Sequence, residues 1–320
     1  MFRRLSGISL MVHSIDKVWD TYGDVLGLKA RENIQLFEKG RYRQRTFRIG
    51  ETALWLLEPL DGPKAPGPGG GMARFLERRG EGLYMITVGL GDEPDRYAKR
   101  LEAKGVKIYW DVPDSGVELT SAPRPNFQMT MHPLIHPRSV HGVLWEMGRH
   151  VPGRFRQAAP ASSPFKRVMA ISMVCQDADA AVKTYTDVLE QDPLLSSTVF
   201  EKGGYKENTI GMGDIALEFQ QPLAGPDAKS EGGNLARSLK QYGEGLYGVT
   251  VDVKDPEQYA KSLDAKGVKV QRVAVEKGKT LAGRSKAPAP TEANYFIIDP
   301  SRTHGVPWKF ARFGMQTEVM

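Results

Sequence analysis

The residues with the clearest capacity for chemistry lie between positions 132 and 150. Four histidines flank the carboxylate of Glu146 in this segment: His132, His136, His141 and His150. Imidazole nitrogens and carboxylate oxygens are common protein ligands of zinc and iron. A metal centre is therefore one chemistry that this cluster could support.

The spacing of the histidines restricts that interpretation. His132 and His136 lie four residues apart on an expected strand, which separates their backbones by roughly 13 Å along one face. One ion cannot bind both side chains, although a site could combine one of them with Glu146. The alternative is that they are turn and surface histidines around the hairpin PRSVHG at 137–142.

Composition describes an ordinary globular protein, and the length of 320 residues favours two domains. Cys175 is the only cysteine, so no intrachain disulfide can form and a reducing cytoplasm is the expected location. The N-terminus has no signal-peptide core, and no stretch approaches the roughly 20 apolar residues of a membrane span. The net charge of +6 comes from basic residues scattered among acidic ones, which argues against a nucleic-acid partner.

An internal repeat organises the whole chain. GEGLYMITV at 80–88 returns as GEGLYGVTV at 243–251, with changes only at Met85 and Ile86. At the same offset of 163 residues, the segment 37–60 aligns with 200–223 without a gap, and HGVLWEM aligns with HGVPWKF. We therefore predict two homologous domains, 1–153 and 166–316, joined by a linker at 154–165.

Each half reads as two βαβββ units. In the first unit a helix with apolar residues at helical spacing follows a short apolar strand, and three strands follow the helix; the ranges are 8–12, 16–28, 33–38, 41–48 and 52–58. The second unit has its helix near 94–105 and strands near 83–90, 106–111, 127–136 and 142–148. The glycine-rich segment APGPGGGM at 65–72 and its counterpart AKSEGGNL lack the end of a phosphate loop, and we interpret them as flexible connections.

This order, with the phrases DKVWDTYGDVLGL, LLEPL, GEGLYMITV and HPRSVHGVLWEM, resembles the vicinal oxygen chelate superfamily. That superfamily includes glyoxalase I, methylmalonyl-CoA epimerase, bleomycin-resistance proteins and type I extradiol dioxygenases. The resemblance implies an α+β fold of four βαβββ modules in two tandem domains. Each domain would be an incomplete barrel of mixed sheet around a pocket, with metal ligands on inward-facing strand positions.

Carried over from this resemblance, the ligand positions have lost most of their donors. In the first half they fall on Gly7, Trp55, Met85 and Glu146, and in the second half on Ala170, Glu218, Gly248 and Lys309. Glycine and alanine offer no side-chain donor, and a protonated lysine repels a cation. The inherited metal site is thus excluded in both halves, and we expect no cofactor.

We expect other roles for the altered positions. In the second half, Glu218 and Lys309 would form an ion pair, or Lys309 would hold a substrate carboxylate. In the first half, Glu146 would stand among Trp55 and Met85, where desolvation should raise its pKa and make it a general base. The alternative is that Glu146 only hydrogen-bonds a neighbour such as His132 or Tyr42.

A hairpin through Gly50 and Glu51 sets further neighbours. It pairs Thr46 with Trp55, and the period-two rule then places Tyr42 and Gln44 on the same face as Trp55. Tyr42 and Gln44 are expected to contact oxygen atoms of a substrate. The expected substrate-binding set also includes Trp55, Met85 and His132.

Three functions agree with these observations. The first is a metal-independent lyase or isomerase that acts on a small oxygenated aromatic or acyl compound, with Glu146 as base. The second is a protein that sequesters a small molecule, as the resemblance to bleomycin-resistance proteins implies. The third is a metalloenzyme with relocated His and Glu ligands. The partner is a small molecule in each case, and the sequence leaves open whether the chain forms a homo-oligomer.

Overall fold

The computed structural model describes residues 2–28, 34–91, 93–110, 117–118, 132–149, 163–191, 194–274, 276, 278–282 and 294–313. The expected residue His150 and nearly all of the expected linker lie outside these ranges. The domain boundaries at 153 and 166 therefore remain predictions.

Each half of the chain forms one mixed nine-stranded sheet. The first sheet has the order β6-β8-β9-β5-β1-β4-β3-β2-β7, and the second has the matching order β15-β17-β18-β14-β10-β13-β12-β11-β16. The strands of the first sheet are β1 (Phe2–Met11), β2 (Gln35–Phe37), β3 (Tyr42–Ile49), β4 (Thr52–Pro59), β5 (Gly82–Leu90), β6 (Ile108–Trp110), β7 (Val117–Glu118), β8 (Pro133–Ile135) and β9 (Leu144–Arg149). Those of the second are β10 (Phe165–Val174), β11 (Leu194–Phe200), β12 (Tyr205–Met212), β13 (Ile215–Pro222), β14 (Gly245–Val253), β15 (Val270–Ala274), β16 (Lys279–Ala282), β17 (Asn294–Ile298) and β18 (Trp308–Ala311).

The helices follow the same repeat. They are α1 (Ile15–Asp20) with the π-helical continuation η1 (Thr21–Val25), α2 (Gly67–Arg79), α3 (Pro94–Ala103), η2 (Pro137–Ser139), α4 (Ala178–Lys183) with η3 (Thr184–Val188), α5 (Glu231–Tyr242), α6 (Pro256–Ala265) and η4 (Pro300–Arg302). The expected α+β fold of four βαβββ modules is confirmed, with β7 and β16 as short additional edge strands. The hairpin through Gly50 is also confirmed, because Thr46 pairs with Trp55.

The interpretation of the glycine-rich segments as flexible connections was wrong, because they begin the helices α2 and α5. Gly70 permits the first turn of α2, since a Cβ atom there would lie 1.8 Å from the carbonyl oxygen of Ala65. In α2, Met72 and Leu76 then lie one turn apart and pack on Met11 and Leu57 of the sheet. Tertiary packing thus stabilises the helix, although the glycine-rich sequence at its start does not indicate a helix.

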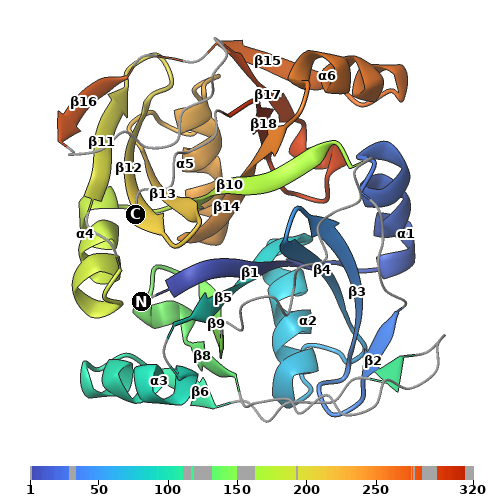
Figure 1. The fold of residues 1–320 in the computed structure, drawn as a ribbon, viewed down its shortest axis with the longest axis vertical. Coiled ribbons are helices and arrows are strands. Elements are labelled where there is room, and N and C mark those ends of the chain that lie inside the picture. Colours follow the sequence, from blue (N-terminus) through green and yellow to red (C-terminus); the bar gives the residue numbers. More distant parts are fainter. Residues whose placement is uncertain are drawn as a thin grey trace.

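The two halves share one hydrophobic core. Two reciprocal tryptophan–tyrosine pairs connect the halves. Trp145 of β9 donates to the hydroxyl of Tyr185 from the second half at 3.0 Å. Trp308 of β18 donates to the hydroxyl of Tyr22 from the first half at 3.3 Å. All four rings are fully buried. Figure 1 shows α1 and α4 at opposite sides of the junction between the halves.

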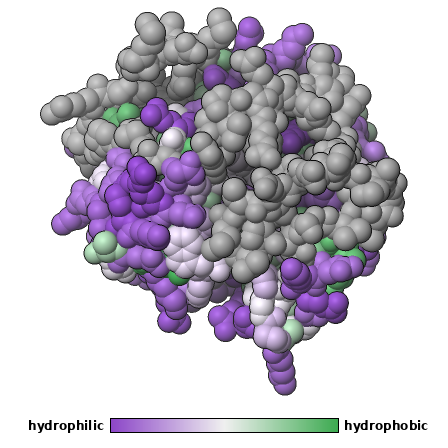
Figure 2. All heavy atoms as spheres, turned by 60° about the horizontal axis from the view of Figure 1, so that its bottom comes forward, coloured by the Kyte–Doolittle hydropathy of each residue, from purple (hydrophilic) through white to green (hydrophobic). Residues whose placement is uncertain are grey.

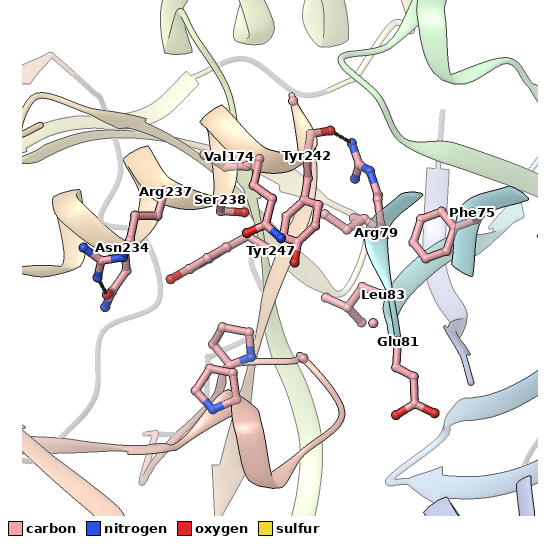
Figure 3. Close-up of a pocket in the computed structure, with 17 residues that line it drawn as sticks. Phe75, Arg79, Glu81, Leu83, Val174, Asn234, Arg237, Ser238, Tyr242 and Tyr247 are labelled. Carbon is pink, nitrogen blue, oxygen red and sulfur yellow. Dashed lines mark hydrogen bonds between the residues drawn. The ribbon is translucent and has the colours of Figure 1, made fainter. Parts of the chain in front are cut away.

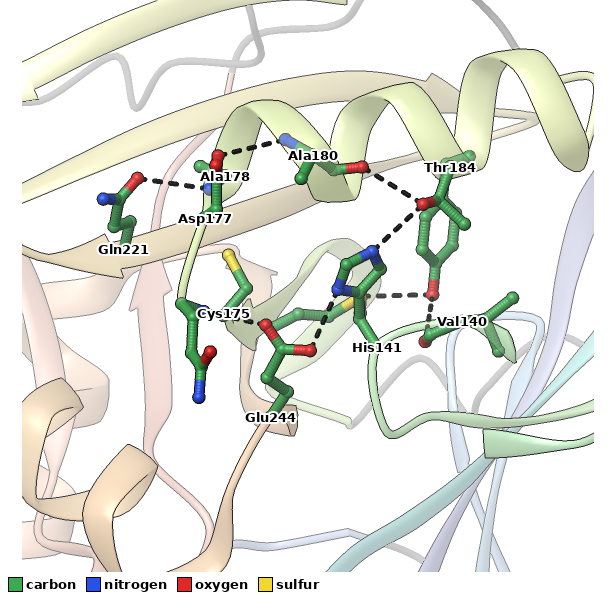
Figure 4. Close-up of polar contacts among 12 residues, drawn as sticks. Val140, His141, Cys175, Asp177, Ala178, Ala180, Thr184, Gln221 and Glu244 are labelled. Carbon is green, nitrogen blue, oxygen red and sulfur yellow. Dashed lines mark hydrogen bonds and ion pairs between the residues drawn. The ribbon is translucent and has the colours of Figure 1, made fainter. Parts of the chain in front are cut away.

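Two histidine-centred contacts fasten this junction, and they account for the repeated sequence phrases. His141 lies 3.0 Å from Glu244 and 3.1 Å from Thr184, both from the second half (Figure 4). In the mirrored contact, His304 lies 2.5 Å from Glu81 and 3.1 Å from Thr21 of the first half. The glutamates belong to the two GEGLY phrases, and the histidines belong to the two HGV phrases.

The surface and the helices of the described residues bear on the expected partners. Figure 2 shows a face whose described surface is predominantly hydrophilic, with small separated hydrophobic areas. None of the helices in the described part of the chain combines the length and hydropathy that crossing a membrane requires. The cytoplasmic location, the lack of a nucleic-acid partner and the oligomeric state remain predictions.

Candidate functional site

Each sheet has one face in the shared core and one face directed away from it. In β4, Leu54 and Leu56 lie in the core, so Trp55 between them belongs to the opposite face. We call this opposite side the first concave face, defined by Gly7, Trp55, Thr87 and Glu146. The second concave face is defined by Ser172, Glu207, Glu218 and Lys309 of the other sheet, in which Glu218 and Lys309 are the counterparts of Trp55 and Glu146.

The first concave face brings the predicted first-half positions onto neighbouring strands. The ring of Trp55 covers Gly7 so closely that a Cβ atom on Gly7 would lie 2.2 Å from it. Met85 and Trp55 both pair with Ser9, and Gly7 pairs with Thr87, which pairs with Glu146. An indole therefore occupies space that a first-strand ligand would need.

Glu146 has two close polar partners. Its carboxylate accepts a hydrogen bond from Thr87 Oγ1 at 2.5 Å and lies 2.9 Å from His132 Nδ1. Its side chain is 21% exposed. Burial acts to raise the pKa of Glu146, but the hydrogen bonds from His132 and Thr87 and the charge of His132 outweigh it, so the pKa lies below its ordinary value. The expectation of a raised pKa was wrong, and the alternative contact with His132 is the one observed.

Tyr42 and Gln44 lie on the same sheet face as Trp55, as the hairpin register predicts. The Tyr42 ring stacks on Phe37 with centroids 4.6 Å apart, and Gln44 Nε2 donates to Gln35 at 3.4 Å. Both side chains thus make contacts within the sheet, and their role toward a substrate remains a prediction.

The remaining histidines do not gather around Glu146. His136 Nδ1 accepts from the backbone N–H of Arg138 at 3.0 Å, and His141 belongs to the junction contact with Glu244. Within the described residues, no three His, Cys, Asp or Glu side chains are grouped closely enough to hold a metal ion. His150 lies outside the described ranges.

The predicted ion pair between Glu218 and Lys309 is replaced by a different one. Lys309 is 9% exposed, and its Nζ lies 3.7 Å from Glu231 on α5. Glu218 instead accepts a hydrogen bond from Ser172 Oγ at 2.6 Å. The prediction was wrong because the segment that carries Glu231 was taken for a flexible connection. Burial opposes the charged form of Lys309, but the charges of Glu231 and Glu218 raise its pKa well above the ordinary value.

The sequence interpretation missed Glu207 on β12. Glu207 Oε2 accepts from Gln220 Nε2 at 2.8 Å, and its neighbour on the same face of β12, Thr209, pairs with Glu218. Burial, followed by the negative charge of Glu218, raises the pKa of Glu207 to about 8. The repeat held the signal, since Glu207 occupies the position of Gln44 in the other half.

Two buried polar atoms on the second concave face lack a hydrogen-bond partner among the described residues. They are Thr209 Oγ1 and Gln220 Oε1, on side chains that are 1% and 0% exposed. Leaving such atoms unpaired costs about 1–3 kcal/mol each. Thr209 pairs with Glu218, and Gln220 pairs with Glu207, so both atoms lie next to the two carboxyl groups.

Comparison with known proteins agrees with this architecture. A sequence model of the Glyoxalase/Bleomycin resistance protein/Dioxygenase superfamily matches residues 4–127. The second half repeats the first in sequence and in strand order. The first half of the chain is thus similar to this superfamily, which includes proteins of the vicinal oxygen chelate fold.

Solved structures of the superfamily share the arrangement of the whole chain. A triple mutant of 4-hydroxymandelate synthase from Streptomyces coelicolor is 15% identical, with a TM-score of 0.65 over 98% of this chain and 93% of that one. A fusion protein of a xylose isomerase-like TIM barrel and a 4-hydroxyphenylpyruvate dioxygenase is 12% identical, with a TM-score of 0.59 over 100% of this chain and 50% of that one. No curated protein sequence matches significantly. At these identities the likeness shows the fold alone.

The superfamily fold implies a metal ion, but the residues of this chain do not fit one. The first half offers Glu146 alone at the inherited positions, and the second half offers Glu218 alone beside the cation of Lys309. A divalent ion needs at least three protein ligands in sites of this kind. The inherited positions of the two faces therefore do not provide a three-ligand metal site.

Proposed function

We propose that the protein is a metal-independent isomerase or lyase that moves a proton on a small oxygenated carbonyl compound, and that the second concave face carries out the reaction. The observation that supports this proposal is the arrangement of Glu207 and Glu218 on adjacent strands, in one buried surface with the cation of Lys309. Two interacting carboxyls and a fixed positive charge are the parts that enolisation requires.

The two carboxyls differ in ways that suit an acid and a base. Glu207 keeps its proton at neutral pH, since its pKa is about 8, and it can therefore act as the general acid. Glu218 accepts a hydrogen bond from Ser172 at 2.6 Å, and in this proposal it is the general base.

The reaction balances without a metal or a redox partner. Glu218 removes a proton from the carbon beside the carbonyl, the C–H electron pair forms a carbon–carbon double bond, and the carbonyl π pair moves to oxygen. Lys309 stabilises the oxyanion. The electron pair on the oxyanion then re-forms the carbonyl. In a β,γ-unsaturated ketone the carbon–carbon electrons shift along the chain and take a proton from Glu207 at the γ carbon, which gives an isomer. In a β-hydroxy ketone they break the C–O bond, and Glu207 protonates the departing hydroxyl, which gives an alkene and water. Proton exchange with water then restores both carboxyls.

The first concave face carries the second candidate for proton transfer. The contact of 2.9 Å between Glu146 and His132 makes a carboxylate–imidazole pair, in which Glu146 orients the ring and His132 exchanges the proton. The lowered pKa of Glu146 favours this role over that of a lone base. The pair is 34% exposed at the histidine, so water competes with a substrate there.

The test is solvent deuterium exchange, because it reports proton removal whatever the product is. Uncharged hydroxyketones, aryl ketones and acyl thioesters are incubated with the protein in D2O, and loss of the signal from the hydrogen beside the carbonyl is followed by proton NMR. We expect Glu218→Gln and Glu207→Gln each to slow exchange by about 100-fold or more, and Glu146→Gln to change it by less than threefold. A chelator should have no effect.

Three results would overturn the proposal. Exchange that survives both substitutions in the second half but disappears in Glu146→Gln would transfer the chemistry to the first half. Exchange that stops after chelation and returns with added metal would support the metalloenzyme. Binding of a tested compound without exchange would favour a sequestration protein of the bleomycin-resistance type.

A further inference from the structure

A crevice lies beside α5. It consists of two adjoining cavities of about 350 and 440 Å³, which share Asn234, Tyr247, Pro300 and Pro307. Each volume lies within the range of small-molecule sites in proteins. Together they make an elongated space that begins at the junction of the two halves.

The inner end of the crevice, which is the second cavity, lies next to the ion pair between Glu231 and Lys309. The second cavity is lined by Glu231 and Ile297. Glu231 is the ion-pair partner of Lys309, and Ile297 pairs with Lys309 between β17 and β18. A molecule in this cavity therefore meets the residues that hold the Lys309 ammonium group.

The outer end has apolar walls. Phe75 and Leu83 of the first half lie on one side, and Leu246, Pro300 and Pro307 of the second half also line the space. Figure 3 shows Leu83 and Phe75 across the opening from Ser238 and Tyr247. Such walls suit an aliphatic or aromatic group.

The charged side chains that line the outer cavity already pair with other groups of the protein. Arg79 donates to the main-chain oxygens of Tyr242 and Glu244 at 2.5 and 2.7 Å, and Arg237 donates to those of Pro226 and Ala228. Glu81 is held by His304 at 2.5 Å. These arginines are therefore poor receptors for a phosphate or a carboxylate.

The charged residues at and beside the second cavity also disfavour an anionic ligand. Lys309 is the cation beside Glu231, Glu218 and Glu207, so the carboxyls outnumber it. The second cavity is also lined by one cation and one further carboxylate, Lys269 and Asp299. A ligand with its own negative charge would meet net repulsion at the inner end.

We propose that this crevice is the substrate site of the second half, and that it takes an uncharged molecule with a carbonyl or hydroxyl head and an apolar tail. The inference rests on the proposed function for its chemistry. The head lies beside Glu231, the ion-pair partner of Lys309, and the tail lies between Pro307 and α5. The alternative in which Lys309 holds a substrate carboxylate is thereby set aside.

The experiment compares three probes: acetophenone as the neutral compound, benzoate as its anionic analogue, and acetyl-CoA as a phosphate-bearing thioester. Binding is measured by ligand-observed NMR with the full chain. Ser238→Trp places a large ring in the outer cavity, and Lys240→Trp adds the same ring at an exposed position of the same helix that does not line the crevice. Gln241→Trp, also in the lining, is the second blocking variant if the first fails to fold.

We expect acetophenone to bind at least tenfold more tightly than benzoate and acetyl-CoA. The crevice variant should weaken acetophenone at least tenfold, and Lys240→Trp should leave it within twofold. Equal or tighter binding of benzoate or acetyl-CoA would overturn the inference, as would acetophenone binding that Ser238→Trp and Gln241→Trp leave unchanged. Glu207→Gln separates the two proposals: if it retains both binding and deuterium exchange, the proposed chemistry fails while the crevice stands.

Discussion

The two concave faces have the same strands in the same order, yet their side chains differ in polarity and charge. The first is dominated by Trp55, whose ring fills the space over Gly7. The second replaces that tryptophan with Glu218 and adds Glu207, Glu231 and Lys309. Loss of the inherited ligand set thus led to two different results: one face is filled by its own aromatic side chain, and the other is rebuilt as a polar cluster.

The difference extends to how each carboxylate is balanced. Glu146 is stabilised in its charged form by an imidazole and a hydroxyl, and its pKa is lowered. Glu207 lies near another carboxylate, and its pKa is raised to about 8. Of the two, the raised pKa is the better match to acid–base catalysis near neutral pH.

The largest effect is expected where the charge is most deeply buried. Lys309→Met leaves Glu231 without its cation, so we expect a loss of about 3–5 kcal/mol in the free energy of unfolding, measured by urea denaturation. The double variant Lys309→Met with Glu231→Leu should recover most of this loss. In the first half, Glu146→Gln should cost only about 1 kcal/mol, because its partner His132 reaches water. Equal losses in the two halves would contradict the comparison.

The second expected effect is a loss of stability when a side chain is added at Gly7, beneath the Trp55 ring. Gly7→Ala places a Cβ atom 2.2 Å from the Trp55 ring, so we expect a loss of about 1–3 kcal/mol in thermal stability. The same change in a Trp55→Val background should be close to neutral. The counterpart Ala170 already has a Cβ atom, because Glu218 stands where the tryptophan would be. If Gly7→Ala is harmless in the wild-type background, the ring does not occupy the old ligand space.

The pH dependence of stability should distinguish the faces by sign. The folded protein holds a proton on Glu207 up to about pH 8, whereas the unfolded chain loses it near the ordinary glutamate pKa. The folded state therefore binds more protons in this window, and stability falls as the pH rises from about 5 to 8. Glu207→Gln should flatten this slope in a series of thermal melts. For Glu146 the sign is reversed: its stabilising contribution is present at neutral pH and is lost as the pH falls below its ordinary pKa.

The junction histidines should have modest effects on stability, and the two effects should be equal. His141→Ala and His304→Ala each remove one hydrogen-bonded contact between the halves, so we expect each to lower stability by about 1–2 kcal/mol. Calorimetry of both variants provides the measurement. A loss more than twice as large at one site would show that the junction is less symmetric than its contacts indicate.

The repeat and the hydrophobic patterning were sufficient to predict the modules and the pairing of Thr46 with Trp55. They could not identify the partner of Lys309, because Glu231 lies at the start of a helix that begins with glycines and depends on packing against the sheet. The contact between His132 and Glu146 depends on the register of β8 against β9, where Leu134 pairs with Glu146. The pKa of each carboxylate follows from such contacts, so spacing alone did not give its direction.

The reciprocal tryptophan–tyrosine pairs have a consequence for any attempt to divide this protein. A chain ending after residue 149 would leave Trp145 without the phenol that covers it, and a chain starting at 165 would leave Trp308 in the same condition. Each fragment would expose a large hydrophobic surface to water and would associate with a copy of itself or precipitate. The duplication has thus produced a molecule whose two copies depend on each other to stay folded.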